Sequence, residues 1–367
     1  MQVTSLFSSS RVQKQTEQAI RRVIKSGVFI GGNEVEAFER AMAAFCKTNY
    51  ALGVNSGTDG LFLSLKALGI GAGDEVITTP FTFIATAAVI ANVGADPVFA
   101  DIEAATFNIN PLEIEKRVTK KTKAIIPVHL FGQMADMEAI MRIAKKYNLF
   151  VIEDAAQAIG ATHQKKQAGS IGDTGCFSFF PTKNLGAYGD GGMVTTNEKT
   201  TARTIGLLKN HGSLPREKYQ NAIWGVNSRL DALQAAVLGV KLKQLEAWNT
   251  KRREKAASYD ALLKLCKEVL TPETDDRNIH VFHEYTIRAS KRDALKPFLE
   301  KHGISVGVYY PIPLHLQPAL ANAGYKKDDF PEAEKAAREV LSLPLSPSIT
   351  KQEQRYVAEK IILFYRR

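Results

Sequence analysis

The sequence of residues 124–152 is AIIPVHLFGQMADMEAIMRIAKKYNLFVI, and this stretch decides the fold class. Residues 124–128 and 149–152 are short apolar runs, as expected for buried strands, and residues 137–147 between them have a helical pattern. A strand, a helix and a second strand in this order predict a parallel pair, because parallel strands need a long crossover connection.

The same alternation continues toward the N-terminus. Further strands are expected at 75–79 and 97–101, and helices at 56–68, 81–93 and 112–118. Strands that are apolar throughout belong to a sheet that is covered on both faces. We therefore expect an α/β fold with a mostly parallel sheet sandwiched by helices. In such sheets ligands bind outside the carboxyl ends of the strands.

The C-terminal third has a different pattern. A long helix is expected from about Asp231 to Trp248, followed by a basic cluster at 249–253 and a strand at 284–288. We place a domain boundary at this cluster. The prediction is a large α/β domain, 1–248, and a small C-terminal α+β domain, 249–367.

Composition excludes several classes of protein. The chain has 367 residues, of which 45% are hydrophobic and 23% charged, as in ordinary globular proteins. Its three cysteines, Cys46, Cys176 and Cys266, have no spacing typical of disulfide frameworks or metal sites. The longest apolar stretch, 84–93, is too short to span a membrane. We expect a cytoplasmic protein with no metal and no membrane partner.

The charge balance favours an anionic ligand. The chain has 48 basic and 38 acidic residues, a net charge of +10. The basic residues are interspersed with acidic ones and form no basic arm, so we expect no nucleic-acid partner. A non-enzymatic basic binding protein remains a remote alternative that rests on net charge alone.

Three polar motifs lie where an α/β sheet places its ligands. Residues 55–60, Asn-Ser-Gly-Thr-Asp-Gly, begin a helix whose free amides favour an anion, although such residues also cap helices generally. Asp154 follows an apolar strand, where it needs a cation or hydrogen-bond donors. Lys183 stands among apolar residues and glycines in 178–192, where burial favours the nucleophilic amine.

Together the three motifs match the needs of one cofactor. An anion cradle suits a phosphate, a buried carboxylate suits a ring nitrogen, and a lysine suits an aldehyde. Pyridoxal 5'-phosphate carries all three groups. The glycines fit neither the dinucleotide fingerprint nor the P-loop pattern.

The motifs identify a resemblance from Gly27 to about Pro347. Ser-Gly-Thr-Asp-Gly at 56–60, Glu-Asp-Ala-Ala-Gln at 153–157, the Lys183 segment and Asn-Ser-Arg-Leu-Asp at 227–231 resemble the DegT/DnrJ/EryC1/StrS sugar aminotransferases. These are fold-type I pyridoxal-phosphate enzymes. Some relatives have histidine in place of Lys183 and catalyse dehydration, so the lysine here implies transamination, with pyridoxamine phosphate as the aminated cofactor.

The resemblance implies roles by position. Lys183 would anchor the cofactor and shuttle the proton, and Asp154 would pair with the ring nitrogen. The other cofactor contacts implied are Gln157 with the ring hydroxyl, Phe83 stacked on the ring, and Gly57, Thr58 and Ser178 with the phosphate. Asn227 would reach the phosphate of a neighbouring subunit, which implies a homodimer with shared active sites.

The resemblance also implies a substrate. The family mostly transfers an amino group from L-glutamate to a keto group of a nucleotide-diphosphate hexose. Residues 227–231 and 309–315 resemble the 3-aminotransferase branch, so C3 is expected. The alternatives are a 4-keto-sugar or aminocyclitol aminotransferase, or another reaction of the same cofactor. The expected substrate contacts are Arg229, Tyr310, His315 and Tyr188.

Overall fold

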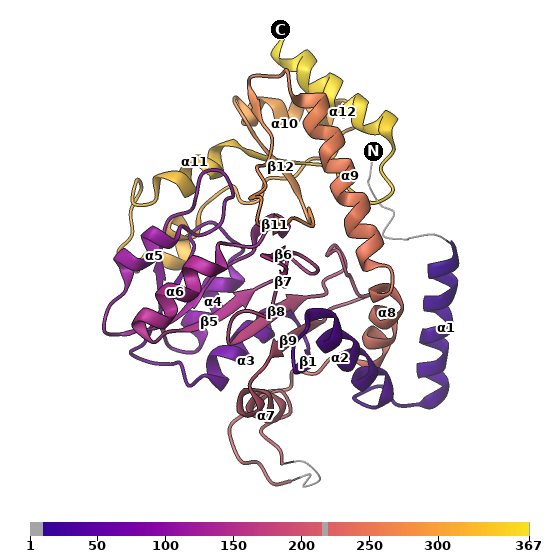
Figure 1. Ribbon diagram of the computed structural model, residues 1–367, viewed down its shortest axis with the longest axis vertical. Helices are drawn as coiled ribbons and strands as arrows, with labels where there is room; N and C mark the ends of the chain where they lie inside the picture. The colour runs from indigo at the N-terminus through magenta and orange to yellow at the C-terminus, as the bar shows by residue number, and fades with distance from the viewer. Residues whose placement is uncertain (1–9, 215–218, 367) are drawn as a thin grey trace.

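The computed structural model describes residues 10–214 and 219–366 (Figure 1). Its centre is a seven-stranded sheet with the order β1-β9-β8-β5-β4-β2-β3. The strands are β1 (Tyr50–Val54), β2 (Glu75–Thr78), β3 (Asp96–Phe99), β4 (Thr122–Ile126), β5 (Phe150–Asp154), β8 (Thr174–Ser178) and β9 (Gly192–Thr196). Strand β9 is antiparallel to both its neighbours, and the other pairings are parallel. The expected mostly parallel sheet is confirmed.

Helices cover the sheet, because its strands are apolar on both faces. They are α1 (Ser10–Ser26), α2 (Asn33–Cys46), α3 (Gly57–Ala67), α4 (Ala85–Asn92), α5 (Pro111–Arg117), α6 (Met137–Tyr147), α7 (Lys199–Leu208) and α8 (Ala232–Leu242), with the short 3-10 helix η1 (Leu130–Gly132). Helix α4 begins later than expected, since residues 79–84 form an irregular turn. A small three-stranded ribbon consists of β6 (Thr162–His163), β7 (Lys166–Gln167) and β11 (Asn278–Ile279).

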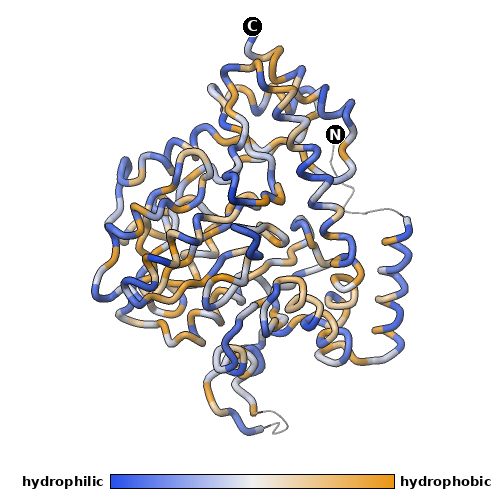
Figure 2. The backbone as a smooth tube through the Cα atoms, in the orientation of Figure 1, coloured by the Kyte–Doolittle hydropathy of each residue, from blue (hydrophilic) through white to orange (hydrophobic). Residues whose placement is uncertain are grey.

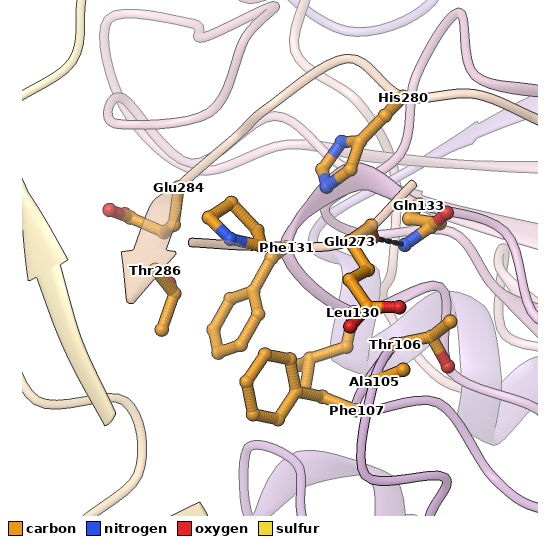
Figure 3. Close-up of a pocket in the computed structure, with 11 residues that line it drawn as sticks. Ala105, Thr106, Phe107, Leu130, Phe131, Gln133, Glu273, His280, Glu284 and Thr286 are labelled. Carbon is orange, nitrogen blue, oxygen red and sulfur yellow. Dashed lines mark hydrogen bonds between the residues drawn. The ribbon is translucent and has the colours of Figure 1, made fainter. Parts of the chain in front are cut away.

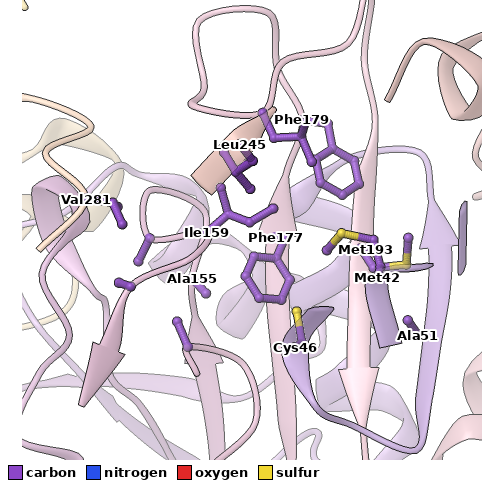
Figure 4. Packing of buried hydrophobic residues seen from close by; sticks show 14 of the residues in the cluster. Met42, Cys46, Ala51, Ala155, Ile159, Phe177, Phe179, Met193, Leu245 and Val281 are labelled. Carbon is purple, nitrogen blue, oxygen red and sulfur yellow. The ribbon is translucent and has the colours of Figure 1, made fainter. Parts of the chain in front are cut away.

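The largest core cluster joins the sheet to the N-terminal helices (Figure 4). Phe177 of β8 and Met193 of β9 pack in the same cluster as Met42 and Cys46 of α2. All three cysteines are free and buried, consistent with cysteines that act as small apolar residues. This packing fixes β8, whose end leads into the Lys183 segment.

The expected helix over 231–248 is two helices. Helix α8 ends at Leu242 and α9 (Leu245–Leu263) begins after a break of two residues. The break lies near the point where the chain passes from one hydrophobic core to another. Leu245 is buried in the largest core cluster, whereas Ala256, Tyr259 and Leu263 are buried in a separate C-terminal cluster. The domain division at 248/249 stays a prediction, and it falls inside α9 where the helix passes between these cores.

The C-terminal cluster surrounds a second sheet of three antiparallel strands with the order β10-β12-β13. Its elements are β10 (Val269–Leu270), β12 (Tyr285–Ala289), β13 (Val340–Leu343), α10 (Arg292–Lys301), α11 (Pro331–Glu339), α12 (Lys351–Tyr365) and the 3-10 helices η2 (Leu314–Leu316) and η3 (Pro318–Leu320). The strand expected at 284–288 is β12. Helix α12 begins with a capping box between Thr350 and Glu353.

One C-terminal segment packs against elements that precede residue 132. Leu314, Phe330 and Val340 share a core cluster with Phe99 and Phe107, which belong to the N-terminal third of the sequence. In Figure 1 α11 accordingly lies above α5, away from α12. The segment 308–340 is therefore packed against residues near the main sheet, although it follows strand β12 of the second sheet.

Helix α1 stands at the edge of the molecule beside α8 (Figure 1). Its hydrophobic residues face α8 and its hydrophilic ones face outward (Figure 2). Val12, Thr16, Ala19 and Val23 are the buried positions, which is the spacing of an amphipathic helix. In residues 10–214 and 219–366, no helix combines the length and apolar character that a membrane span requires.

Candidate active site

The Lys183 loop leaves β8 and returns to β9, and backbone hydrogen bonds close it. The N–H of Phe179 donates to Gly191 O at 2.8 Å, and that of Ala187 to Phe179 O at 2.8 Å. Gly186 turns so tightly that an added Cβ would lie 2.3 Å from Pro181 O. The buried Lys241 of α8 donates to Gly186 O at 2.6 Å. The loop is thus held at both ends and at its turn.

Lys183 is half-buried in this loop. Burial lowers the pKa of its amine, while the carboxyl groups of Asp154 and Glu284 act in the opposite direction. A lowered pKa increases the share of free amine at neutral pH, the form that attacks an aldehyde. The expectation that the lysine is shielded and close to Asp154 agrees with this arrangement.

Asp154 ends β5 at the carboxyl edge of the sheet and is buried. Its Oδ2 accepts from Thr86 Oγ1 at 2.9 Å, and its Oδ1 accepts from Ala156 N at 3.2 Å. Burial raises the pKa of the carboxyl, against these two hydrogen bonds and the charge of Lys183. A buried carboxylate of this kind gains most from a cationic partner. Thr86 was not expected from sequence, since nothing in the α4 pattern distinguishes it from a core threonine.

The N-terminus of α3 forms an anion cradle. Ser56 caps the helix by accepting from Asp59 N at 3.0 Å, while the amides of Gly57 and Thr58 have no acceptor among residues 10–214 and 219–366. A Cβ at Gly57 would lie 2.8 Å from Ser178 Cβ, so glycine is required for this approach of α3 to β8. The cradle therefore brings free amides beside the Ser178 hydroxyl, which suits a phosphate.

The aromatic side of the site is formed by Phe83 and Tyr310. Their ring centroids are 6.3 Å apart, and Phe83 is 56% exposed, so its ring is accessible to a ligand. Gln157 donates through Nε2 to Tyr310 Oη at 3.1 Å and accepts from Phe131 N at 2.7 Å. Gln157, Phe83 and Tyr310 are thus brought together as expected.

The other expected substrate residues are more scattered. Arg229 donates to Asn210 Oδ1 at 2.8 Å, and its buried Nε has no partner among the described residues. Tyr188 is exposed, with its ring 4.4 Å from Lys241 Nζ. Asn227, expected to reach the cofactor of a second subunit, is exposed. His315 is buried and lies 3.1 Å from Glu334 Oε1, so its contact with a substrate stays a prediction.

Glu153, the neighbour of Asp154, has a structural role that sequence did not indicate. Its fully buried carboxylate accepts from His129 Nε2 at 2.9 Å and from the backbone N–H groups of Gly169, Ile171 and Gly172 at 2.7–2.8 Å. His129 Nδ1 accepts from Ala135 N at 3.2 Å, so Nε2 carries the proton. His129 therefore orients Glu153 and stays out of the site.

We expect Glu153→Gln to destabilise the protein by about 3 kcal/mol, because an amide nitrogen would face donors that now bind a carboxylate oxygen. Urea denaturation followed by circular dichroism measures this change. The exposed Glu359 of α12 supplies the control, and Glu359→Gln should shift the unfolding free energy by less than about 0.5 kcal/mol. Equal stabilities of the two variants would contradict the structural role.

The described residues fit pyridoxal phosphate. The α3 amides, the Gly57–Ser178 approach, the exposed Phe83 ring, the buried Asp154 and the Lys183 amine lie around one end of the sheet. When bound, this cofactor supplies an aldehyde for the amino group and a ring that accepts electrons from the adjacent carbon. Fold and site together define a pyridoxal-phosphate-dependent transferase.

Comparison with known proteins gives the family. The model of the DegT/DnrJ/EryC1/StrS aminotransferase family matches residues 10–362, and the chain belongs to this family. It is a pyridoxal-phosphate-dependent aminotransferase. The resemblance seen in the motifs is confirmed, and the alternative of a non-enzymatic binding protein is excluded.

Individual relatives agree over almost their whole length. A protein of Geobacillus stearothermophilus named "Pleiotropic regulatory protein" is 52% identical over 100% of this chain and 99% of its own. The dTDP-3-amino-3,6-dideoxy-alpha-D-galactopyranose transaminase of Aneurinibacillus thermoaerophilus is 46% identical, over 96% and 95%. The crystal structure of S. venezuelae DesV in complex with a ketimine intermediate superposes with a TM-score of 0.95 and 40% identity, covering 97% of this chain and 96% of that one.

Proposed function

We propose that this enzyme transfers the amino group of L-glutamate to the C3 keto group of a nucleotide-linked hexose. The observation that carries the proposal is the Lys183–Asp154 pair at the carboxyl edge of the sheet, in a chain 46% identical to a 3-amino-sugar transaminase. The net charge of +10 suits a nucleotide diphosphate. The Geobacillus protein is named for a regulatory role. A purely regulatory protein would not require the Lys183–Asp154 pair.

The resemblance in the motifs supports the cofactor roles that we propose. Gly57, Thr58 and Ser178 bind the phosphate, Phe83 stacks on the ring, and Gln157 contacts the ring hydroxyl. Asp154 would hold the proton of the ring nitrogen, and the Lys183 amine would anchor the cofactor and move the substrate proton. Arg229, Tyr310 and Tyr188 would border the sugar, and the guanidinium of Arg229 could bind a phosphate through paired donors.

The function is tested by two half-reactions. The purified enzyme with pyridoxal phosphate should lose its visible absorption when L-glutamate alone is added, with 2-oxoglutarate formed. A 3-keto nucleotide hexose should then restore the absorption and yield the amino sugar, identified by mass spectrometry. If only another amino donor removed the visible absorption, the assignment of L-glutamate as donor would be wrong. If a 4-keto sugar restored the absorption and a 3-keto sugar did not, the C3 assignment would be wrong.

We also infer that the enzyme is a homodimer with shared active sites. Exposed apolar side chains gather in two segments: Phe29 and Ile30 are 46% and 50% exposed, and Trp224 is 98% exposed. The first segment is joined to the chain that follows Trp224, since Ile30 forms a β-bridge with Asp231. Such a surface is typical of an interface, and Asn227 lies three residues from Trp224, where it can reach a second copy.

Mixing two inactive variants tests the shared site. Lys183→Ala and Asn227→Ala are purified separately and mixed under conditions that exchange subunits. If Asn227 acts across the interface, a mixed dimer has one intact site, and an equal mixture should recover about a quarter of the wild-type activity. No recovery, with mixed dimers shown by native mass spectrometry, would mean that Asn227 acts within its own subunit.

A further inference from the structure

Helix α8 presents two polar side chains to the Lys183 loop. Gln234 and Lys241 are seven residues apart, close to two full helical turns, so they share one face of α8. Gln234 Oε1 accepts from Tyr188 N at 2.8 Å, and Lys241 Nζ donates to Gly186 O at 2.6 Å. One face of one helix therefore holds the loop at two positions shortly after Lys183.

A third anchor holds the residue that follows the reactive lysine. Asn184 Nδ2 donates to Asn249 Oδ1 of α9 at 2.9 Å and to Val281 O at 3.1 Å. Segment 280–284, which contains Val281, lines a cavity of about 10 Å³ together with Phe131 of η1 (Figure 3). Asn184 is thus bound to α9 and to a segment that is itself packed against η1.

These anchors determine where the Lys183 amine lies. Among residues 10–214 and 219–366, the amine has no hydrogen-bond or ion-pair partner of its own. The backbone N–H of Lys183 donates to Phe180 O at 2.9 Å, so the main chain forms a turn at this residue. The direction of the side chain is then set by the backbone, between this turn and the anchors that follow it. A displacement of about 1 Å at a reacting group can cost on the order of 10²-fold in rate.

Lys241 is an unusual residue for a purely structural anchor. It is 5% exposed, and its contacts are Gly186 O and the Tyr188 ring, whose centroid lies 4.4 Å from Nζ. No carboxylate lies within 4.0 Å of Nζ in the part of the chain that the structure describes. Burying an ammonium without an acid partner costs stability, and a methionine of similar length would fill the space without this cost. Packing alone therefore does not require an amine here.

We propose that Lys241 and Gln234 are positioning residues for the amino-group transfer. From one face of α8 they fix residues 186–188, so that the Lys183 amine and the Tyr188 ring keep one orientation relative to each other. The buried charge of Lys241 then serves the orientation of the loop and not the stability of the fold. The inference rests on the assignment of Lys183 as the reactive amine under the proposed function, and it adds two residues that act through the loop.

The test measures how fast pyridoxal phosphate becomes attached to Lys183. The full-length protein, freed of cofactor, is mixed with pyridoxal phosphate and quenched with borohydride at successive times, and the labelled peptide is quantified by mass spectrometry. Lys241→Met should slow attachment about tenfold at saturating pyridoxal phosphate, because the turn at Gly186 loses its donor. The half-saturating concentration should change less than about twofold, since the α3 cradle is untouched. The melting temperature should shift by less than about 3 °C.

Further variants separate orientation from charge. Gln234→Leu removes the acceptor of Tyr188 N without a change in net charge, and it should slow attachment about fivefold. Gln234→Glu keeps an acceptor oxygen, and Lys241→Arg keeps a charged donor, so both should recover most of the wild-type rate. Lys243→Met, at an exposed lysine that caps the same helix, is the matched control and should attach the cofactor as fast as wild type.

The outcomes distinguish a positioning role from a structural one. An unchanged attachment rate in either Lys241→Met or Gln234→Leu would overturn the proposal. A slower rate that appears only together with a large fall in melting temperature would also overturn it, because a purely structural role predicts that combination. Attachment uses neither glutamate nor sugar, so a failure of the proposed transamination would appear in the half-reactions and not in this measurement.

Discussion

Lys183→Ala should reduce amino-group transfer by about 10³-fold or more, since no other amine takes its place as nucleophile and proton carrier. The lysine lies in a loop closed by backbone bonds and by Lys241, and none of these contacts uses its own amine. The fold should therefore persist. Activity is measured as 2-oxoglutarate released from glutamate, and folding by circular dichroism.

Covalent attachment separates the role of Lys183 from a general loss of charge. After incubation with pyridoxal phosphate and reduction with borohydride, the wild type should gain the cofactor mass on the peptide that contains Lys183, and the variant should not. Lys251→Ala, at an exposed lysine of α9, is the matched control and should behave as wild type. Attachment to a different lysine in the wild type would move the active site elsewhere.

Asp154→Asn should lower turnover by about 10³-fold. An ion pair with the ring nitrogen at about 4 Å is worth roughly 4 kcal/mol at an effective dielectric near 20, and each 1.36 kcal/mol is about tenfold in rate. Asparagine keeps the shape and both hydrogen bonds, because its amide can donate to the Thr86 hydroxyl and accept from Ala156 N. The loss should appear in kcat at saturating cofactor.

The same substitution should not destabilise the protein without cofactor. Burial raises the pKa of Asp154 in the folded state, so the folded chain binds its proton more tightly than the unfolded chain. The stability that this group contributes is then largest at low pH and falls as pH rises toward the folded pKa. At pH 7 Asp154→Asn should melt no lower than wild type. A lower melting temperature at pH 7 would contradict this account, and full activity would remove Asp154 from the mechanism.

The sheet and the cofactor side of the site could be predicted from sequence, because the residues concerned belong to short motifs next to recognisable strands and helices. Asp154 ends β5, Gly57 begins α3 and Lys183 lies in the loop that follows β8, and the edge of a parallel sheet brings such positions together. The alternation of apolar runs and helices therefore gives both the fold and the place of these residues. The motifs add chemistry that topology alone does not contain.

The remaining features depend on contacts between distant segments. Glu153 and Asp154 are adjacent acids, and only the position of residues 169–172 makes the first structural. Likewise, Asn184 shows no special signal in the sequence, yet it donates to Asn249 Oδ1 and to Val281 O from distant segments. The break between α8 and α9 is likewise invisible in the apolar pattern, because it reflects which of two cores each helix joins.

The packing of segment 308–340 against Phe99 and Phe107 has a consequence for building hybrid enzymes. Exchanging everything after residue 248 between relatives would place a foreign Phe330 and Leu314 against the native Phe99 and Phe107. Mismatched volumes in such a core cost stability. A hybrid that alters sugar preference should therefore take residues 81–107 and 308–340 from the same parent. The side chains of this shared core then keep the partners with which they pack.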